Sequence, residues 1–398
     1  MTTATIETAR NLIGAPRSAA PTPALLLDLP KAQRNIDEMA RRMASLPASL
    51  RPHAKIHKSP ILGRMQLEAG AIGLTTATVW EASAMVDAGI DEILIANQVI
   101  GPFKAAELAR LCGLARVIAA VESVVNADAL SEAAAAAGTQ IGVLVEYDVG
   151  LHRCGTRTHE AALALAERIQ RAPGLRLFGL LGYEGHCMLE PDREVRVEKT
   201  HAANAALTAL VDMFERARLP TEIVAAGGLG TWDITGANPR ITEIHAGSYI
   251  FMDSFHRKLV PGFEVALTVL GTVISRHASM AVLDIGRKAI GIDRALPELV
   301  GGQAVVRYEH GEHFIHEEHT AIILNDGADL DVGDRVELMS GYAPTTVNFY
   351  DMFYVVDDER IIDVWPVLGR YGTGSIGQPA QVAGLTSRLA RPTREPAA

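Results

Sequence analysis

A lysine that could take part in chemistry lies in the basic segment RPHAKIHKSP, residues 51–60. Lys55 is flanked by His53 and His57, and Lys58 follows closely. Positive charges this close together lower the affinity of each amine for a proton. A lysine that loses its proton near neutral pH can attack an aldehyde and form a Schiff base. Because an isolated basic run is more often solvated surface or an anion patch, this interpretation needs support from the rest of the chain.

Two glycine-rich segments offer a place for a phosphate group. AGGLGTWD (226–233) and HAGSYIFMD (245–253) each follow a run typical of a strand. Bare backbone N–H groups in such loops bind phosphate. Neither segment has the lysine of a P-loop or the full spacing of a dinucleotide fingerprint, which favours a small phosphorylated cofactor over a nucleotide. Either loop alone is more often a turn, but two of them together with a reactive lysine favour the functional interpretation.

Further polar residues follow other strand-like runs. Glu146, Asp148 and Arg153 follow QIGVLV, and Tyr183 follows LRLFGLLG. We interpret the two carboxylates as a structural pair that orients Arg153.

The elements that must position these residues alternate regularly. From about residue 24 to 250, short apolar runs alternate with Ala-rich helical runs, which predicts a parallel sheet closed into a (β/α)8 barrel. The nine strand candidates include HAKIH at 53–57 and are one more than a barrel needs. The first, which ends before Pro30, is therefore expected to belong elsewhere. Chemistry in barrels is staged at the carboxyl ends of the strands, where all the candidate residues above are expected.

A change in the pattern of apolar and turn residues divides the chain into two predicted domains. After about residue 255 the Ala-rich runs give way to short strands separated by Gly, Asp and Asn turns. The sequence predicts an α/β protein with a barrel over 22–255, a β-rich domain over 256–385, and flanking tails at 1–21 and 386–398.

Composition indicates an ordinary globular protein. The 398 residues are 48% hydrophobic and 21% charged, with a formal net charge of −10 and no long basic block, which argues against nucleic-acid binding. Three scattered cysteines indicate neither a disulfide framework nor a zinc knot. No secretory signal or membrane-spanning run is recognisable, so we expect a cytoplasmic protein that does not enter membranes.

The order of these segments resembles the D-threonine aldolase and D-serine dehydratase family, pyridoxal phosphate (PLP) enzymes of the alanine-racemase fold, type III. The resemblance covers about residues 22–373 and depends on several motifs in combination. These motifs are TPALLLDL, RPHAKIHKSP, EYDVGLHRCG, the tyrosine of GYEGH, AGGLGTWD, GSYIFMD, LDIGRKAIGID, EEH at 317–319, TTVNFYD and DVWPV.

The resemblance implies a role for each matching residue. Lys55 would form the Schiff base with PLP, and Arg153 and Tyr183 would contact its ring. The phosphate would be held by Gly228, Gly230, Thr231, Gly247, Ser248 and Tyr249. The family also places the first strand with the β domain, and its members are commonly homodimers in which one chain's β domain closes the other's barrel.

One departure from the family concerns a metal. Members that need a divalent metal carry a histidine, and two residues later an aspartate or cysteine, before a Thr-x-Asn stretch in the second domain. Here Tyr342 and Pro344 occupy those positions. Proline offers no side-chain ligand, tyrosine is an uncommon one, and the single imidazole of His319 rarely holds a catalytic ion. We therefore expect no metal site.

Three classes of function remain open at this stage. The first is a lyase acting on a β-hydroxy-D-amino acid by retro-aldol cleavage to glycine and an aldehyde, with Tyr342 or His319 as the base at the hydroxyl group. The second is another reaction of the same family, either racemisation or epimerisation with Lys55 and Tyr342 as the two bases, or a D-serine dehydratase-like elimination of ammonia. The third is a PLP-carrier protein, which the presence of the β domain disfavours.

Overall fold

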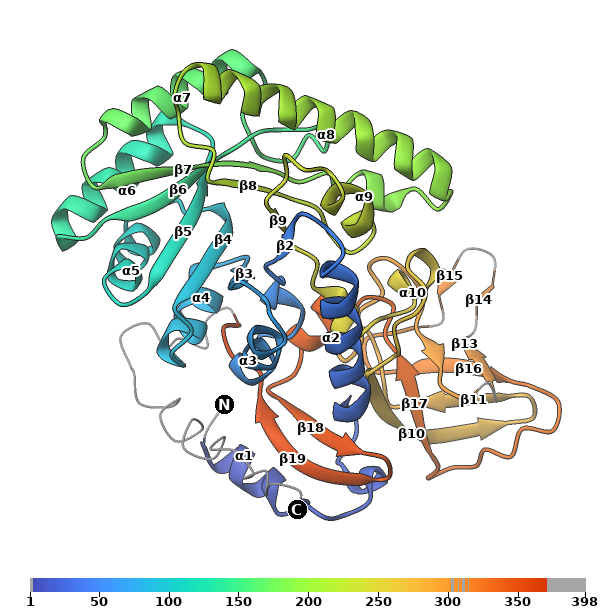
Figure 1. The fold of residues 1–398 in the computed structure, drawn as a ribbon. Coiled ribbons are helices and arrows are strands. Elements are labelled where there is room, and N and C mark those ends of the chain that lie inside the picture. Colours follow the sequence, from blue (N-terminus) through green and yellow to red (C-terminus); the bar gives the residue numbers. More distant parts are fainter. Residues whose placement is uncertain (1–2, 302–303, 307, 310–311, 314, 371–398) are drawn as a thin grey trace, which may run out of the picture.

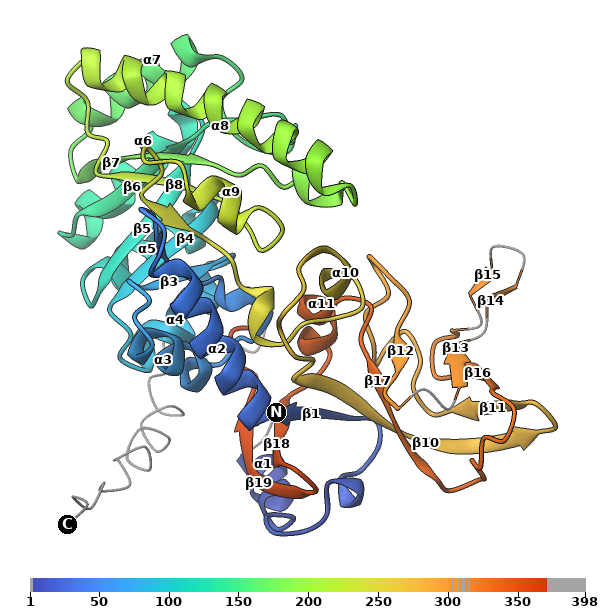
Figure 2. The same ribbon diagram turned by 45° about the vertical axis from the view of Figure 1, so that its right-hand side comes forward.

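The computed structural model describes residues 3–301, 304–306, 308–309, 312–313 and 315–370. Within them a barrel domain lies beside a strand-rich domain (Figures 1 and 2). The final part of the expected β domain, 371–385, and the expected tail 386–398 lie outside the described residues. No helix in the described ranges is both long and apolar enough to cross a membrane.

Eight parallel strands form the barrel in the order β2-β9-β8-β7-β6-β5-β4-β3. The end strands β2 and β3 are joined by a parallel bridge between His53 and Thr75, which closes the sheet on itself. The predicted TIM-type barrel is therefore confirmed. The strands are β2 (Ser49–Leu50), β3 (Leu74–Thr76), β4 (Glu92–Gln98), β5 (Arg116–Val121), β6 (Ile141–Glu146), β7 (Leu175–Gly182), β8 (Ile223–Ala226) and β9 (Glu243–Ile244).

Crossover helices pack around the barrel (Figure 1). Several begin at a side chain that accepts a hydrogen bond from a backbone N–H of the first turn, as at Ser59, Thr78, Ser123 and Thr158. The helices are α2 (Leu29–Met43), α3 (Pro60–Glu68), α4 (Val79–Asp87), α5 (Pro102–Cys112), α6 (Val124–Ala137), α7 (His159–Arg171), α8 (Arg193–Arg216) and α9 (Trp232–Gly236).

Apolar side chains fill the barrel interior, as in other closed parallel barrels. Because both faces of each strand are buried, these strands read as continuous apolar runs rather than as alternating ones. Burying one such Val, Leu, Ile or Phe side chain contributes about 1.5–3 kcal/mol to stability. One buried cluster is made of Leu94, Ile118, Ala120, Leu144, Phe178, Leu181, Ile223 and Ala225.

The segment HAKIH is not a strand, contrary to the sequence prediction. Residues Ala54–Ile56 form a single turn of 3-10 helix, η2, which the His53 side chain caps by accepting the backbone N–H of Lys55. Strand β2 ends at Leu50, just before Pro52, which has no N–H to give to a sheet. Lys55 therefore projects from a tight turn beyond its strand.

The second domain is built on a mixed sheet with the order β13-β16-β11-β10-β1-β18-β19, in which β17 also pairs with β10 and β12. Strand β1 runs antiparallel to β10 and parallel to β18, so the ninth strand candidate belongs to this sheet, as expected. The strands are β1 (Ala24–Asp28), β10 (Leu267–His277), β11 (Met280–Leu283), β12 (Glu298–Leu299), β13 (Ala304–Val306), β16 (Thr320–Leu324), β17 (Arg335–Met339), β18 (Met352–Asp357) and β19 (Arg360–Pro366), with the separate pair β14 (Tyr308–Glu309) and β15 (Glu312–His313).

The N-terminal segment, expected to be a tail, has regular structure. Helix α1 (Thr3–Arg10) lies against β19, and Pro16 forms a β-bridge with Arg360. Ala9 and Ala20 are buried against this sheet. Residues 3–21 therefore extend the second domain rather than flank it.

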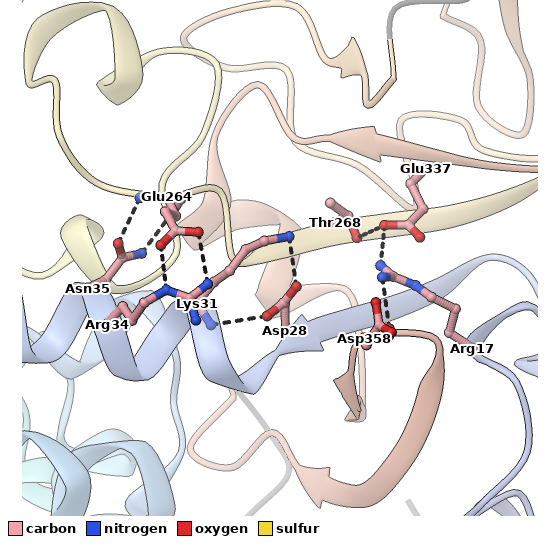
Figure 3. A network of polar contacts seen from close by, with 9 residues as sticks. All are labelled: Arg17, Asp28, Lys31, Arg34, Asn35, Glu264, Thr268, Glu337 and Asp358. Atoms are coloured by element: carbon pink, nitrogen blue, oxygen red, sulfur yellow. Dashed lines mark hydrogen bonds and ion pairs between the residues drawn. The ribbon is translucent and has the colours of Figure 1, made fainter.

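Polar contacts fix helix α2 to the second domain (Figure 3). Arg34 binds the Glu264 carboxylate with both Nε and Nη2, at 2.6 and 3.0 Å. Asn35, which is buried, donates to the Glu264 carbonyl oxygen and accepts its N–H. Asp28 accepts the N–H of Lys31 and so starts the helix. These bonds hold the chain between β1, α2 and β10 in one arrangement, which sets how the second domain meets the barrel mouth.

Candidate active site

A cavity of about 240 Å³ lies at the carboxyl ends of the barrel strands, beside the start of α11 (Ala343–Asn348) from the second domain. Regular alternation of strands and helices brings distant segments to this rim, as the sequence predicted. Seven of the eleven residues expected to be catalytic or to bind the cofactor line the cavity. They are Lys55, Arg153, Tyr183, Gly228, Gly247, Ser248 and Tyr342.

The pKa of Lys55 is lowered to about 8, chiefly by burial. The Glu81 carboxylate opposes this shift, and the charges of Arg153 and Lys58 contribute to it. Glu81 is itself buried, pairs with Lys58, and accepts the N–H of Ala77 at 2.6 Å. Lys55 therefore has a neutral amine available near physiological pH.

The two neighbouring histidines do not act as cations, contrary to the sequence argument. Burial lowers the pKa of His53 well below its usual value and that of His57 to about 4. The His57 ring accepts the N–H of Ser59 and contacts Gln66, so it is a structural residue. Burial is thus the main cause of the Lys55 shift, and the charges that assist it are Arg153 and Lys58.

The two glycine-rich loops present free N–H groups. In the described part of the chain, the N–H groups of Leu229, Gly230, Gly247 and Ser248 take part in no hydrogen bond. Three of these residues, Leu229, Gly247 and Ser248, line the same cavity, and their N–H groups are suited to a phosphate group.

A buried carboxylate fixes the conformation of the first glycine-rich loop, residues 226–233. Glu184, which is 1% exposed, accepts the N–H of Gly227 at 3.0 Å and the hydroxyls of Thr231 and Thr235 at 2.7 and 2.5 Å. Thr231 Oγ1 in turn accepts the N–H of Gly228. The Glu184 carboxylate therefore binds the N–H of Gly227 and two threonine hydroxyls, while the N–H groups of Leu229 and Gly230 remain unbound.

Gly247→Ala is expected to weaken binding of a phosphorylated cofactor about 10- to 100-fold, the cost of one lost charged hydrogen bond. An added Cβ would lie 2.6 Å from the carbonyl oxygen of His53, so the backbone that carries the free N–H groups must move. Fluorescence titration with PLP measures the change. Gly113→Ala is the matched control, because its φ is −77° and its nearest contacts lie at 3.3 Å or beyond. Equal affinity of both variants would contradict a phosphate site at Gly247.

Arg153 and Tyr183 lie together over one side of the cavity, with the guanidinium carbon 5.6 Å from the centre of the phenol ring. Burial, and then Glu184, raise the pKa of Tyr183, which keeps its hydroxyl protonated. Asp148 does not pair with Arg153, contrary to expectation. It accepts the N–H groups of Gly150 and His152 and so shapes the loop after β6.

Four of the expected site residues do not line the cavity. Gly230 and Thr231 directly follow lining residues, and the Thr231 hydroxyl is committed to Glu184. The Tyr249 side chain points into the core, where its hydroxyl accepts from Gln66 at 2.8 Å. His319 is exposed before β16 in the second domain, with its carbonyl oxygen accepting the N–H of His316. Within this chain, His319 is not brought to Lys55.

Sequence reasoning missed a buried network between β2 and β9 of the barrel. Arg51 makes two hydrogen bonds to Glu243, at 3.0 and 3.1 Å, and Glu243 also binds His245 Nε2 at 3.0 Å. Burial would raise the pKa of Glu243, but His245 and Arg51 outweigh burial and lower it to about 2. His245 lines the cavity, so this network supports the wall next to the second glycine-rich loop.

Sequence reasoning also missed His256, which lines the cavity from the first turn of α10 (His256–Leu259). Its ring binds Asp253 and stacks on Tyr342. The spacing Asp-x-x-His in MDSFH was a usable signal, because an aspartate side chain commonly accepts the backbone N–H of a residue two or three positions later.

Similarity to known proteins agrees with this geometry. Residues 27–254 match the family model for the alanine racemase N-terminal domain, and residues 266–356 match that for a serine dehydratase domain. D-threonine aldolase of Arthrobacter sp. is 33% identical over 90% of this chain and 94% of its own. 3-Hydroxy-D-aspartate aldolase of Paracoccus denitrificans is 34% identical with the same coverage. The crystal structure of D-threonine aldolase from Filomicrobium marinum aligns with a TM-score of 0.85 at 33% identity, covering 89% of this chain and 97% of the other.

A closed parallel barrel with a lysine-lined cavity at its mouth, joined to a strand-rich second domain, defines a protein of the alanine-racemase fold. Within that fold, the chain belongs to the D-threonine aldolase family, and its class is that of the lyases. Membership implies PLP as the cofactor. The residues present fit it, because a lysine with a lowered pKa and a cradle of free N–H groups line the same cavity.

Proposed function

We propose that this protein is a PLP-dependent aldolase that cleaves a β-hydroxy-D-amino acid to glycine and an aldehyde. Two aldolases of such substrates are 33% and 34% identical to it over nine-tenths of its length. The observation that carries the proposal is the position of Lys55, whose amine has a pKa of about 8 inside the cavity at the barrel mouth.

Lys55 would attach the cofactor aldehyde in this proposal, and the two glycine-rich loops would hold its phosphate. Gly228, Gly230 and Gly247 let the backbone approach closely, and Ser248 adds a free N–H group. Thr231 and Tyr249 would contribute backbone or support, since their side chains bind Glu184 and Gln66. Arg153 and Tyr183 would face the ring of the cofactor, as the resemblance implies.

When bound, PLP supplies an acceptor for the electron pair released at the substrate Cα. The residues of the chain must then hold the substrate and remove a proton from its β-hydroxyl group. Burial, and then Asp253, raise the pKa of Tyr342. A phenol with a raised pKa stays protonated, so it is suited to donate a hydrogen bond, and less of the ionised form that could act as a base is present. The observation weighs against Tyr342 both as the base for the hydroxyl and as the second base of a racemase.

We further propose that the reaction needs no divalent metal. The family's ligand positions hold Tyr342 and Pro344. Burial raises the pKa of Tyr342, and the Pro344 side chain has no atom that can bind a metal. This donor set does not suit a divalent cation.

The test is an assay of purified protein with PLP and a panel of D- and L-3-hydroxy amino acids, with and without EDTA. We expect aldehyde and glycine from the D substrates, with less than about a twofold effect of EDTA. A strict requirement for added manganese or magnesium would refute the metal-free proposal alone. Release of ammonia would select the dehydratase, and loss of optical purity without aldehyde would select a racemase. No turnover of any substrate would revive a carrier role.

The homodimer, the cytoplasmic location and the absence of nucleic-acid and membrane partners stay predictions. Exposed apolar side chains at the rim of the barrel mouth are compatible with a subunit contact. Ile100 and Phe103 follow β4, and Val125 follows β5, with exposed fractions of 51%, 59% and 78%.

A further inference from the structure

A histidine that the sequence did not single out lies in the same cavity as Lys55. His256 is 3% exposed, lines the cavity, and lies next to Tyr342. The segment that carries it follows the second glycine-rich loop, and Tyr342 comes from the second domain. The side chain therefore belongs to the contact between the two domains at the barrel mouth.

A fully buried carboxylate fixes the orientation of this imidazole. Asp253, which is 0% exposed, lies 2.8 and 2.9 Å from Nδ1 of His256 through its two oxygens and accepts the backbone N–H of the same residue at 2.8 Å. It also accepts the N–H of Ala343 at 3.0 Å. One carboxylate thus holds the imidazole and the start of α11 in a single unit.

The hydrogen bonds assign the roles of the two ring nitrogens. An ionised carboxylate can only accept hydrogen bonds. We therefore infer that Nδ1 carries the ring proton and donates a hydrogen bond to Asp253. In the neutral ring, Nε2 then has a free lone pair. Within the described residues, Nε2 of His256 has no hydrogen-bond partner. A buried, oriented and unpartnered base therefore remains in a cavity where a substrate must bind.

The neighbouring phenol limits where the ring can move. The rings of His256 and Tyr342 are stacked, with centroids 5.9 Å apart and planes 21° apart. Since Tyr342 holds its proton firmly, it can donate a hydrogen bond beside Nε2 without competing as a base. The pair therefore offers one acceptor and one donor side by side.

We propose that His256 is the catalytic base that takes the β-hydroxyl proton, with Asp253 as its positioning residue, in place of the metal that relatives use. The inference rests on the proposed aldolase function. The hydroxyl proton passes to Nε2, and the O–H electron pair becomes the second bond of the aldehyde carbonyl. The Cα–Cβ bond breaks and leaves its electron pair on Cα, for which PLP, when bound, would supply the acceptor. Cα then gains a proton from solvent as His256 releases one.

His256→Gln is expected to lower kcat for aldehyde release about 100- to 10,000-fold, the usual worth of a general base. Glycine has no β-hydroxyl group, so its binding needs no such base. We therefore expect glycine to change the visible spectrum of the PLP-loaded variant with the same Kd, within about twofold, as it does in the unaltered protein. His159→Gln is the matched control, because His159 binds the carbonyl oxygen of Ala206 on the outside of the barrel.

Asp253→Asn tests the positioning role by a readout other than turnover. With histidines labelled with 15N, the unaltered protein should show His256 with its proton on Nδ1. Asp253→Asn should shift that signal toward a mixture of tautomers and lower kcat more than it changes KM. An unchanged tautomer together with unchanged kcat would overturn the role of Asp253.

The outcomes separate this inference from the proposed function. If the unaltered protein cleaves 3-hydroxy-D-amino acids and His256→Gln cleaves them at the same rate, only the role of His256 is overturned. If His256→Gln also loses glycine binding, the residue is structural and the inference is overturned as well. If the unaltered protein releases no aldehyde from any substrate, the proposed aldolase function is wrong, and the proton transfer assigned to His256 is wrong as well.

Discussion

Lys55→Ala should lose covalent attachment of PLP and lower aldolase turnover by more than about 1,000-fold, since the attachment and the chemistry both need its amine. The pKa of about 8 means that about a quarter of the amines are neutral at pH 7.5, against about one in a thousand at the usual lysine pKa. Visible absorbance of the dialysed protein measures attachment, and aldehyde release measures turnover.

Two controls distinguish chemistry from folding in this experiment. Lys55→Arg keeps a positive charge but supplies no amine that condenses with an aldehyde, so it should behave like the alanine variant. Lys104→Ala removes a lysine on α5 that lies over the Trp80 ring, away from the cavity, and should keep both cofactor and activity. A coloured and active Lys55→Ala protein would contradict the assignment.

Glu243→Gln should destabilise the protein by about 3–5 kcal/mol, the cost of leaving one charge of a buried ion pair without its partner. The side chains of Arg51, which follows β2, and of Glu243, the first residue of β9, are each 3% exposed and link these two barrel strands. Urea unfolding followed by fluorescence measures the change. Asp212→Ala is the control, because its pair with Arg240 is exposed and should contribute less than about 1 kcal/mol.

The effect of Glu243→Gln should depend on pH in a defined direction. The pKa of Glu243 is lowered to about 2 from an ordinary value of 4.5. A lowered folded-state pKa gives stability that is complete above the unfolded pKa and is lost as pH falls toward the folded one. The difference between variant and unaltered protein should therefore be constant above about pH 5.5 and shrink below pH 4.5. A difference that grows on acidification would contradict the buried pair.

Strand and helix positions were predictable because their causes are local. The alternation of apolar and Ala-rich runs indicates the strands and helices, and local side chains such as Thr78 and Ser123 cap the starts of α4 and α6. The barrel rule then placed Lys55, Arg153 and Tyr183 at one rim, and the structure has them in one cavity. The turn at Ala54–Ile56 was not predicted, because its residues also suit a strand and only packing decides between the two.

The electrostatics and the contact between domains were beyond the sequence. Whether His53 and His57 carry charge depends on burial, which a basic run does not reveal. His256 and Tyr342 lie together where the segment after the barrel meets the second domain, with the N–H of Ala343 bound to Asp253 and the N–H of Ser254 bound to the Ser340 carbonyl oxygen. The sequence around His256 does not indicate that Tyr342 lies beside it, and the reverse also holds. The family resemblance singled out Tyr342 but not His256.

Reduction with borohydride followed by peptide mapping tests the central claim most directly. Trypsin does not cleave the Arg51–Pro52 bond or at a modified lysine, so PLP fixed on Lys55 yields one peptide spanning residues 43–58 that carries the reduced cofactor. We expect this peptide in place of the fragments 43–55 and 56–58. Label on another lysine, or unmodified fragments from protein saturated with PLP, would contradict the account.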